Sequence, residues 1–138
     1  MKIIILGGGE VGGTLAASLA SEKIDITVVD SKASRLRTLQ NKLDIACVVG
    51  HAAHPEVLFQ AGIEDADMLI AVTATDEVNM IACQIAHTLY HTPTKICRIR
   101  ASAYANKKEL FSSGAVPVDV IIAPEDLVTD HILGLLIY

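Results

Sequence analysis

Short apolar runs alternate with longer amphipathic segments along the whole chain. Six of these runs consist almost entirely of Ile, Val, Leu or Ala and are bounded by polar residues or glycine. Unbroken runs of this length are typical of strands that are buried on both faces of a parallel sheet. We therefore predict strands at residues 2–6, 25–29, 45–49, 67–71, 95–99 and 118–122.

The segments between and after these runs have helical periodicity. Pro55 and Pro124 suit first-turn positions of two helices, and Thr75 or Asp76 can cap another. Two glycines, at positions 62 and 114, stand where helices should stop. We predict helices at residues 10–22, 32–42, 55–61, 76–91, 103–113 and 124–138.

Strands and helices alternate six times, and this alternation predicts an α/β fold. Right-handed crossovers between successive strands give a Rossmann-type doubly wound sheet of six parallel strands, with helices on both faces and the strand order 3-2-1-4-5-6. The elements use up the chain, so we expect one domain over residues 1–138. In this order the first and fourth strands are neighbours, and the ligand crevice opens at their carboxyl ends.

Three glycines follow the first predicted strand at the spacing of a dinucleotide-binding loop. In such a loop the first glycine permits a tight turn and the second lets the backbone approach a pyrophosphate. The third lets the helix pack close to the strand, and the start of that helix offers N–H groups to the phosphates. The candidate cofactor-binding residues here are Gly7, Gly8, Gly9, Glu10, Val11 and Gly12. The alternative is that the glycines serve close packing alone.

A carboxylate ends the second apolar run, at the distance from the glycines that this kind of site requires. Asp30 is placed to accept hydrogen bonds from the ribose hydroxyls of adenosine, and its charge would repel the 2′-phosphate of NADP. Asp is also a common helix cap, so a purely structural role for Asp30 is the alternative.

The fourth and fifth strands supply the other wall of the predicted crevice. Thr73 and Ala74 should face the cofactor with small side chains, backbone groups and one hydroxyl. Arg98 lies in an otherwise apolar strand and needs an anionic partner, which a phosphate or a neighbouring carboxylate can provide. His51 follows the third strand, close to the expected position of an adenine ring.

Composition and charge exclude several classes of protein. The net charge is −5 and no basic run is present, which disfavours a nucleic-acid partner. The apolar stretches are too short to span a bilayer, and because a strand is predicted directly after Met1 we expect no signal peptide. The three cysteines, Cys47, Cys83 and Cys97, are expected to be reduced, buried thiols of a cytoplasmic protein.

No catalytic group or metal site emerges from the sequence. A dehydrogenase needs a further region to hold its substrate, and the predicted elements leave no residues for one. His87 and His91 have a spacing that suits zinc, but they lack a third ligand. We therefore expect a binding module and no enzyme; the alternative is a small NAD-dependent oxidoreductase or a fragment of one.

The last predicted helix, residues 124–138, is apolar on nearly every side. Such a helix packs against two surfaces, and only one of them can belong to this domain. We expect the other to be a second subunit. Because the apolar pattern stops without a cap, we also expect the chain to be a fragment of a longer protein.

Five segments together carry a resemblance to a known family: KIIILGGGEVGGTLA, DITVVDSKASRLRTLQ, VVGHAAHPEVLFQAGIEDADMLIAVTATDEVNM, KICRIR and GAVPVDVIIAPEDLV. The chain resembles the N-terminal RCK domain, also written KTN, of the peripheral regulatory subunits of bacterial Trk potassium uptake systems. The resemblance implies binding of NAD or NADH, with ATP and ADP as further ligands of the same cleft. It assigns the nucleotide contacts to Gly7–Val11, Asp30, Thr73, Ala74 and Arg98.

The same resemblance implies a place in the cell and a set of partners. The protein would be cytoplasmic, peripheral to the inner face of the membrane, and would act on a membrane potassium transporter subunit of the Trk type. From the two-sided last helix we also expect homo-oligomers, in which copies pair through that helix into dimers and assemble into a ring. Members of the family carry further domains, including a small C-terminal ligand-binding domain.

Overall fold

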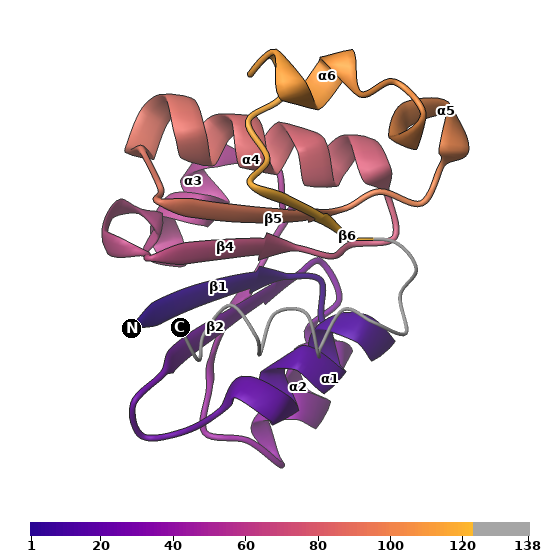
Figure 1. The fold of residues 1–138 in the computed structure, drawn as a ribbon. Helices are drawn as coiled ribbons and strands as arrows, with labels where there is room; N and C mark the ends of the chain where they lie inside the picture. The colour runs from indigo at the N-terminus through magenta and orange to yellow at the C-terminus, as the bar shows by residue number, and fades with distance from the viewer. Residues whose placement is uncertain (123–138) are drawn as a thin grey trace.

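The computed structural model describes residues 1–122 of the chain. One sheet of six parallel strands runs through this part, in the order β3-β2-β1-β4-β5-β6 (Figure 1). The predicted Rossmann-type topology is therefore confirmed. The strands are β1 (Lys2–Leu6), β2 (Asp25–Asp30), β3 (Ala46–Val49), β4 (Met68–Ala71), β5 (Thr94–Arg98) and β6 (Val120–Ile122).

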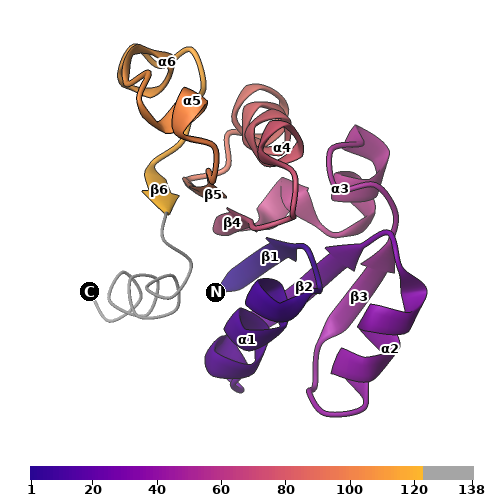
Figure 2. The same cartoon turned by 90° about the vertical axis from the view of Figure 1, so that its right-hand side faces the viewer.

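Helices cover both faces of the sheet, as Figure 2 shows. On one face lie α1 (Glu10–Leu19) and α2 (Ala33–Gln40), and on the other lie α3 (Pro55–Gln60) and α4 (Asp76–Tyr90). Two short helices, α5 (Ser102–Ala105) and α6 (Glu109–Ser112), lie on the same side as α4. A 3₁₀ turn, η1 (Ile63–Asp65), precedes β4. No helix of the described residues is long and apolar enough to cross a membrane.

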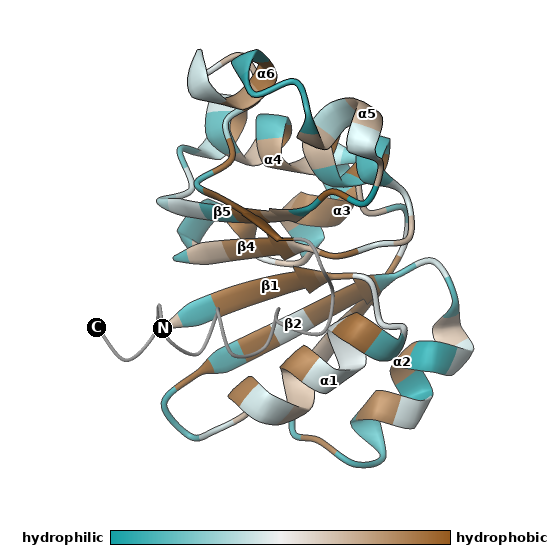
Figure 3. Cartoon of the chain, turned by 45° about the vertical axis from the view of Figure 1, so that its right-hand side comes forward, coloured by the Kyte–Doolittle hydropathy of each residue, from teal (hydrophilic) through white to brown (hydrophobic). Residues whose placement is uncertain are grey.

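The apolar core consists of two clusters, one on each face of the sheet. Alternate side chains of β1 point to opposite faces, so Ile3 and Ile5 join the cluster under α1 while Ile4 and Leu6 join the cluster under α4. All four are fully buried. Full burial of such a side chain contributes about 1.5–3 kcal/mol to the stability of the fold. Burial on both faces explains the unbroken apolar runs of the sequence, which Figure 3 shows as brown strands.

Two predicted helices differ from the structure. The helix predicted at 10–22 ends at Leu19, because Ala20 is extended and Ser21 pairs with Ile24 in a turn that leads into β2. The single helix predicted at 103–113 is wrong, since α5 and α6 are separate there. Residues 106–108 are polar, and the amides of Lys107 and Leu110 bond three residues back instead of four.

The predicted roles of two glycines and one proline at helix ends are confirmed. Gly62 and Gly114 have φ values of 90° and 80°, in the left-handed region, after α3 and α6. Pro55 lies in the first turn of α3. The helix predicted at 124–138, with Pro124, lies outside the described residues.

Candidate functional site

A cavity of about 420 Å³ opens at the carboxyl ends of the central strands. It lies at the predicted switch point, between the loops that follow β1 and β4, and the loops after β2 and β3 complete its wall. The predicted site residues that line it are Gly7, Gly9, Glu10, Val11, Asp30, Thr73, Ala74 and Arg98. Gly8 and Gly12 are not among the lining residues, and each has a structural contact instead.

Packing alone requires two glycines of the loop. Gly7 has a φ of 107°, and a β-carbon there would lie 2.9 Å from the carbonyl oxygen of Val72 in the neighbouring strand's loop. A β-carbon on Gly12 would overlap the carbonyl oxygen of Gly7. These two residues therefore let α1 begin directly against the end of β1.

The packing of the described residues does not require the third glycine. Gly9 is the N-cap residue of α1 and has extended backbone. A β-carbon there would approach only the guanidinium of Arg35, at 3.9 Å, which is an ordinary contact. A glycine at this position leaves the backbone at the start of α1 open on the cavity side, which agrees with the predicted role of Gly9 beside a phosphate group.

Asp30 ends β2 with a buried carboxylate, 6% exposed, that joins two loops. Its Oδ2 accepts a hydrogen bond from the amide of Gly8 at 2.7 Å, and its Oδ1 accepts one from the amide of Lys32, also at 2.7 Å. The N-cap residue of α2 is Lys32, so Asp30 is not the cap of this helix, but it has a structural role in holding the backbone before it. Each oxygen keeps a second lone pair for a ligand hydroxyl, so the two roles are compatible.

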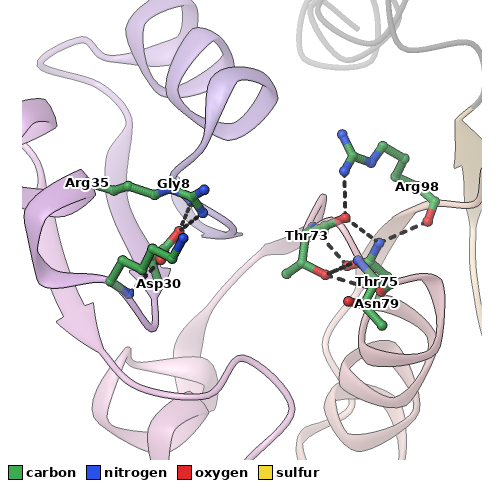
Figure 4. Close-up of polar contacts among 8 residues, drawn as sticks. Gly8, Asp30, Arg35, Thr73, Thr75, Asn79 and Arg98 are labelled. Carbon is green, nitrogen blue, oxygen red and sulfur yellow. Dashed lines mark hydrogen bonds and ion pairs between the residues drawn. The ribbon is translucent and has the colours of Figure 1, made fainter.

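The far wall of the crevice is organised by Asn79, which sequence analysis missed. This side chain of α4 is completely buried. Its Oδ1 accepts hydrogen bonds from the amide and the hydroxyl of Thr73, at 2.9 and 2.7 Å. Its Nδ2 donates to the carbonyls of Thr73 and Arg98, at 3.2 and 3.0 Å (Figure 4). Asn79 thus ties the ends of β4 and β5 to α4.

The hydroxyl of Thr73 has partners within the protein. They are Asn79 and, within its own turn, the backbone of Thr75. Thr73 also lines the cavity, and its contact with a cofactor stays a prediction. Ala74 lines the cavity beside it with a small side chain.

The guanidinium of Arg98 reaches the same loop. Arg98 is buried and lines the cavity, and its Nη2 donates to the carbonyl of Thr73 at 2.7 Å. This bond goes to a backbone carbonyl, and the predicted phosphate or carboxylate partner stays a prediction. Arg100, two residues further on, lies beyond the end of β5 and is exposed.

Asp76 has a different role from the predicted cap of its own helix. Its carboxylate accepts hydrogen bonds from the amides of Arg100 and Ala101, at 3.0 and 2.8 Å. Thr75 occupies the N-cap position of α4 without a capping bond from its side chain. The start of α4 is thereby fastened to the chain that leaves β5.

Replacing Asn79 with Ala is expected to lower the free energy of unfolding by about 2–4 kcal/mol, because it leaves several buried backbone groups without partners. Urea denaturation of the two proteins measures the difference. Gln84→Ala is the control, since Gln84 lies farther along α4 and its side chain bonds the exposed Thr88 hydroxyl. Similar, small losses for both variants would contradict the role of Asn79.

The described lining of the cavity includes one histidine and no cysteine. His51 lines the cavity, and its ring stacks on His54 with centroids 4.3 Å apart. Cys83 and Cys97 are buried free thiols, and Cys47 is half-buried. A hydrogen bond with Cys83, together with burial, raises the pKa of the Cys97 thiol well above its usual range. Among residues 1–122, no cluster of three or more potential metal ligands is found.

A parallel sheet with this strand order, a glycine turn at its switch point and a buried carboxylate after β2 defines a Rossmann-type domain. A sequence-family comparison makes the assignment specific. Residues 3–124 match the family described as the TrkA-N domain. The chain belongs to this family.

Similar proteins with curated descriptions include two called Trk system potassium uptake protein TrkA. The chain is 66% identical over 136 residues to the one from Halomonas elongata and covers 30% of its length. It is 60% identical over 139 residues to the one from Vibrio alginolyticus and again covers 30% of its length. These matches cover 99% and 100% of the present chain. The chain thus spans about a third of the length of these relatives.

Solved structures share the fold at lower sequence identity. The TrkA-N domain of the inner membrane protein ybaL from Escherichia coli superposes with a TM-score of 0.75 at 21% identity, covering 98% of this chain and 96% of that one. The GsuK channel bound to NAD superposes with a TM-score of 0.72 at 19% identity, covering 88% and 21%.

Proposed function

We propose that the chain is a nucleotide-sensing regulatory domain of a potassium uptake system and that it binds NAD or NADH in the crevice. The observation that carries the proposal is the carboxylate of Asp30, which is held beside the glycine turn and lines the cavity. In this position it would accept hydrogen bonds from the adenosine ribose. The start of α1, with Gly9, Glu10 and Val11, would face the phosphates.

The chemistry of the crevice favours adenine nucleotides without a 2′-phosphate. Asp30, the carboxylate that would lie beside the ribose, repels such a group. ATP and ADP share the adenosine and phosphate parts of NAD, so they are further candidate ligands. The site would bind these ligands without catalysing a reaction.

The proposed physiological role follows from the relatives. Those that cover this chain are named as potassium uptake proteins of the Trk system. By analogy, the domain would lie in the cytoplasm at the inner face of the membrane, form homo-oligomers in which dimers assemble into a ring, and act on a membrane potassium transporter subunit of the Trk type. A ligand changes transport only if it binds one conformation better than another. A tenfold change in the ratio of the two conformations needs a difference of about 1.4 kcal/mol between the free energies with which the ligand binds them.

Isothermal titration of the chain with NADH, NAD, NADPH, ATP and S-adenosylmethionine tests the proposal. We expect dissociation constants on the order of micromolar for NADH, NAD or ATP and at least roughly tenfold weaker binding of NADPH and S-adenosylmethionine. A preference for S-adenosylmethionine, or no binding of any of the five, would contradict it. Turnover of NADH with a small carbonyl or quinone compound would support an oxidoreductase instead.

A further inference from the structure

A second cationic side chain of the crevice, Arg35, belongs to none of the predicted site residues. It lies in the first turn of α2 and extends across to the glycine loop of the neighbouring β-α unit, as Figure 4 shows. Its side chain is 47% exposed and lines the cavity. Arg35 therefore stands on the near wall, opposite Arg98 on the far wall.

The protein contacts of Arg35 leave most of its hydrogen-bonding capacity available. Its Nη1 lies 3.6 Å from Oδ2 of Asp30, which is too long for a hydrogen bond. Asp30 does not depend on this contact, because each of its oxygens already accepts a backbone N–H at 2.7 Å. Among residues 1–122, no hydrogen bond from the guanidinium of Arg35 is found.

The guanidinium of Arg35 lies close to the start of α1. Its Nη1 and Cζ lie 3.9 and 4.0 Å from the point that a β-carbon on Gly9 would occupy. Gly9 is the N-cap residue, where the helix dipole and the first N–H groups favour an anion. A planar guanidinium with several donors matches the geometry of phosphate oxygens better than any other side chain.

The charges around the cavity also favour a cation here. Asp30 and Glu10 are both acidic and both line the cavity, and a nucleotide with two or more phosphate charges would add to their repulsion. Arg98 is 5% exposed and lies on the far wall, where it bonds the Thr73 carbonyl. Arg35 is the exposed cation that stands over the glycine loop.

We propose that Arg35 binds the phosphate chain next to the adenosine ribose and thereby selects ligands by their phosphate charge. This inference rests on the proposed function, since it assigns a residue to the phosphate part of the same nucleotide. It differs from two other roles that the position allows. In one, Arg35 only screens the charge of Asp30; in the other, it binds a 2′-phosphate on the ribose.

Arg35→Gln in the 138-residue chain separates these roles. Gln removes the charge and keeps a good helix former at an exposed position of α2. Binding of ADP and NADH is expected to weaken about tenfold or more, while binding of adenosine, followed by NMR up to millimolar concentrations, stays the same. The difference between the two proteins toward ADP should shrink as salt is added, because an exposed ion pair is screened. Arg35→Lys should keep part of the affinity for ADP.

Arg37→Gln is the matched control, because Arg37 lies in the same helix, is exposed and does not line the cavity. It should leave the binding of ADP unchanged. Unchanged binding of ADP by Arg35→Gln, or equal losses for adenosine and ADP, would overturn the proposal while nucleotide binding itself stands. A loss confined to NADPH would assign Arg35 to a 2′-phosphate and also overturn it. If the unaltered chain binds no adenine nucleotide, the proposed function fails together with this inference.

Discussion

Gly12→Ala is expected to lower the free energy of unfolding by about 2–4 kcal/mol and to disrupt the crevice at the switch point. The added methyl group would overlap the carbonyl oxygen of Gly7, a backbone atom at the end of β1. Relief of this overlap requires α1 to move away from the strand, and the loop that lines the cavity moves with it. Urea denaturation measures the first effect, and titration with NADH measures the second.

The next residue supplies a matched control for this substitution. A β-carbon on Gly13 would meet a terminal methyl group of Leu39 at 3.2 Å, and a side-chain end of this kind can rotate away. Ala is also favoured over Gly inside a helix by about 0.5–1 kcal/mol. Gly13→Ala should therefore be close to neutral in stability and in binding. Equal destabilisation by the two substitutions would show that contact with the Gly7 carbonyl is not the cause.

Asp30→Asn is expected to weaken the binding of NAD and NADH by about ten- to a hundredfold. An amide has one acceptor oxygen where the carboxylate has two, so it cannot serve both backbone N–H groups and a ribose. Loss of the negative charge should bring the affinity for NADPH closer to that for NADH. Titration with each of the dinucleotides measures both effects.

Asp25→Asn is a suitable control for Asp30→Asn, because Asp25 is exposed at the opposite end of β2. It should change neither affinity nor selectivity. Because Asp30 also holds Gly8 and Lys32, the ligand-free stability of Asp30→Asn has to be measured as well. If this variant folds and discriminates against NADPH as strongly as the unaltered chain does, the ribose assignment is wrong.

The order of the sheet was predictable because each strand and turn has a recognisable local pattern in the sequence. Strands such as β1 are apolar on both faces, and turns that require a positive φ carry glycine, as at Gly62. The boundaries were less predictable. Three polar residues at 106–108 are compatible with one exposed helical turn, and the hydrogen-bond pattern of the folded chain shows that α5 and α6 are separate.

The two walls of the crevice differed in how well the sequence predicted them. One β-α-β unit contains Gly7, Gly12 and Asp30, so their spacing in the sequence is enough to identify them. Asn79 is a polar residue in a helix, and nothing local indicates that it reaches across to the ends of β4 and β5.

Arg35 was missed for a related reason. It is one of several basic residues in and before α2, and its sequence position does not show which of them turns toward the glycine loop. The one usable signal was that Arg35 lies in the first turn of the helix that follows Asp30. Which basic side chain faces the glycine loop depends on the helical phase, and this phase depends on the residue at which α2 begins.

The buried side chains at the rim of the crevice also bear on the entropy of binding. The amides of Gly8, Thr73 and Ala101 lie in loops, yet each donates to a side chain that is at least nine-tenths buried. Their conformational freedom is lost when the chain folds and not when a ligand arrives. The binding of a ligand would then have to order mainly exposed side chains such as Arg35. Most of the entropy that binding costs within this domain is therefore concentrated in a few flexible groups.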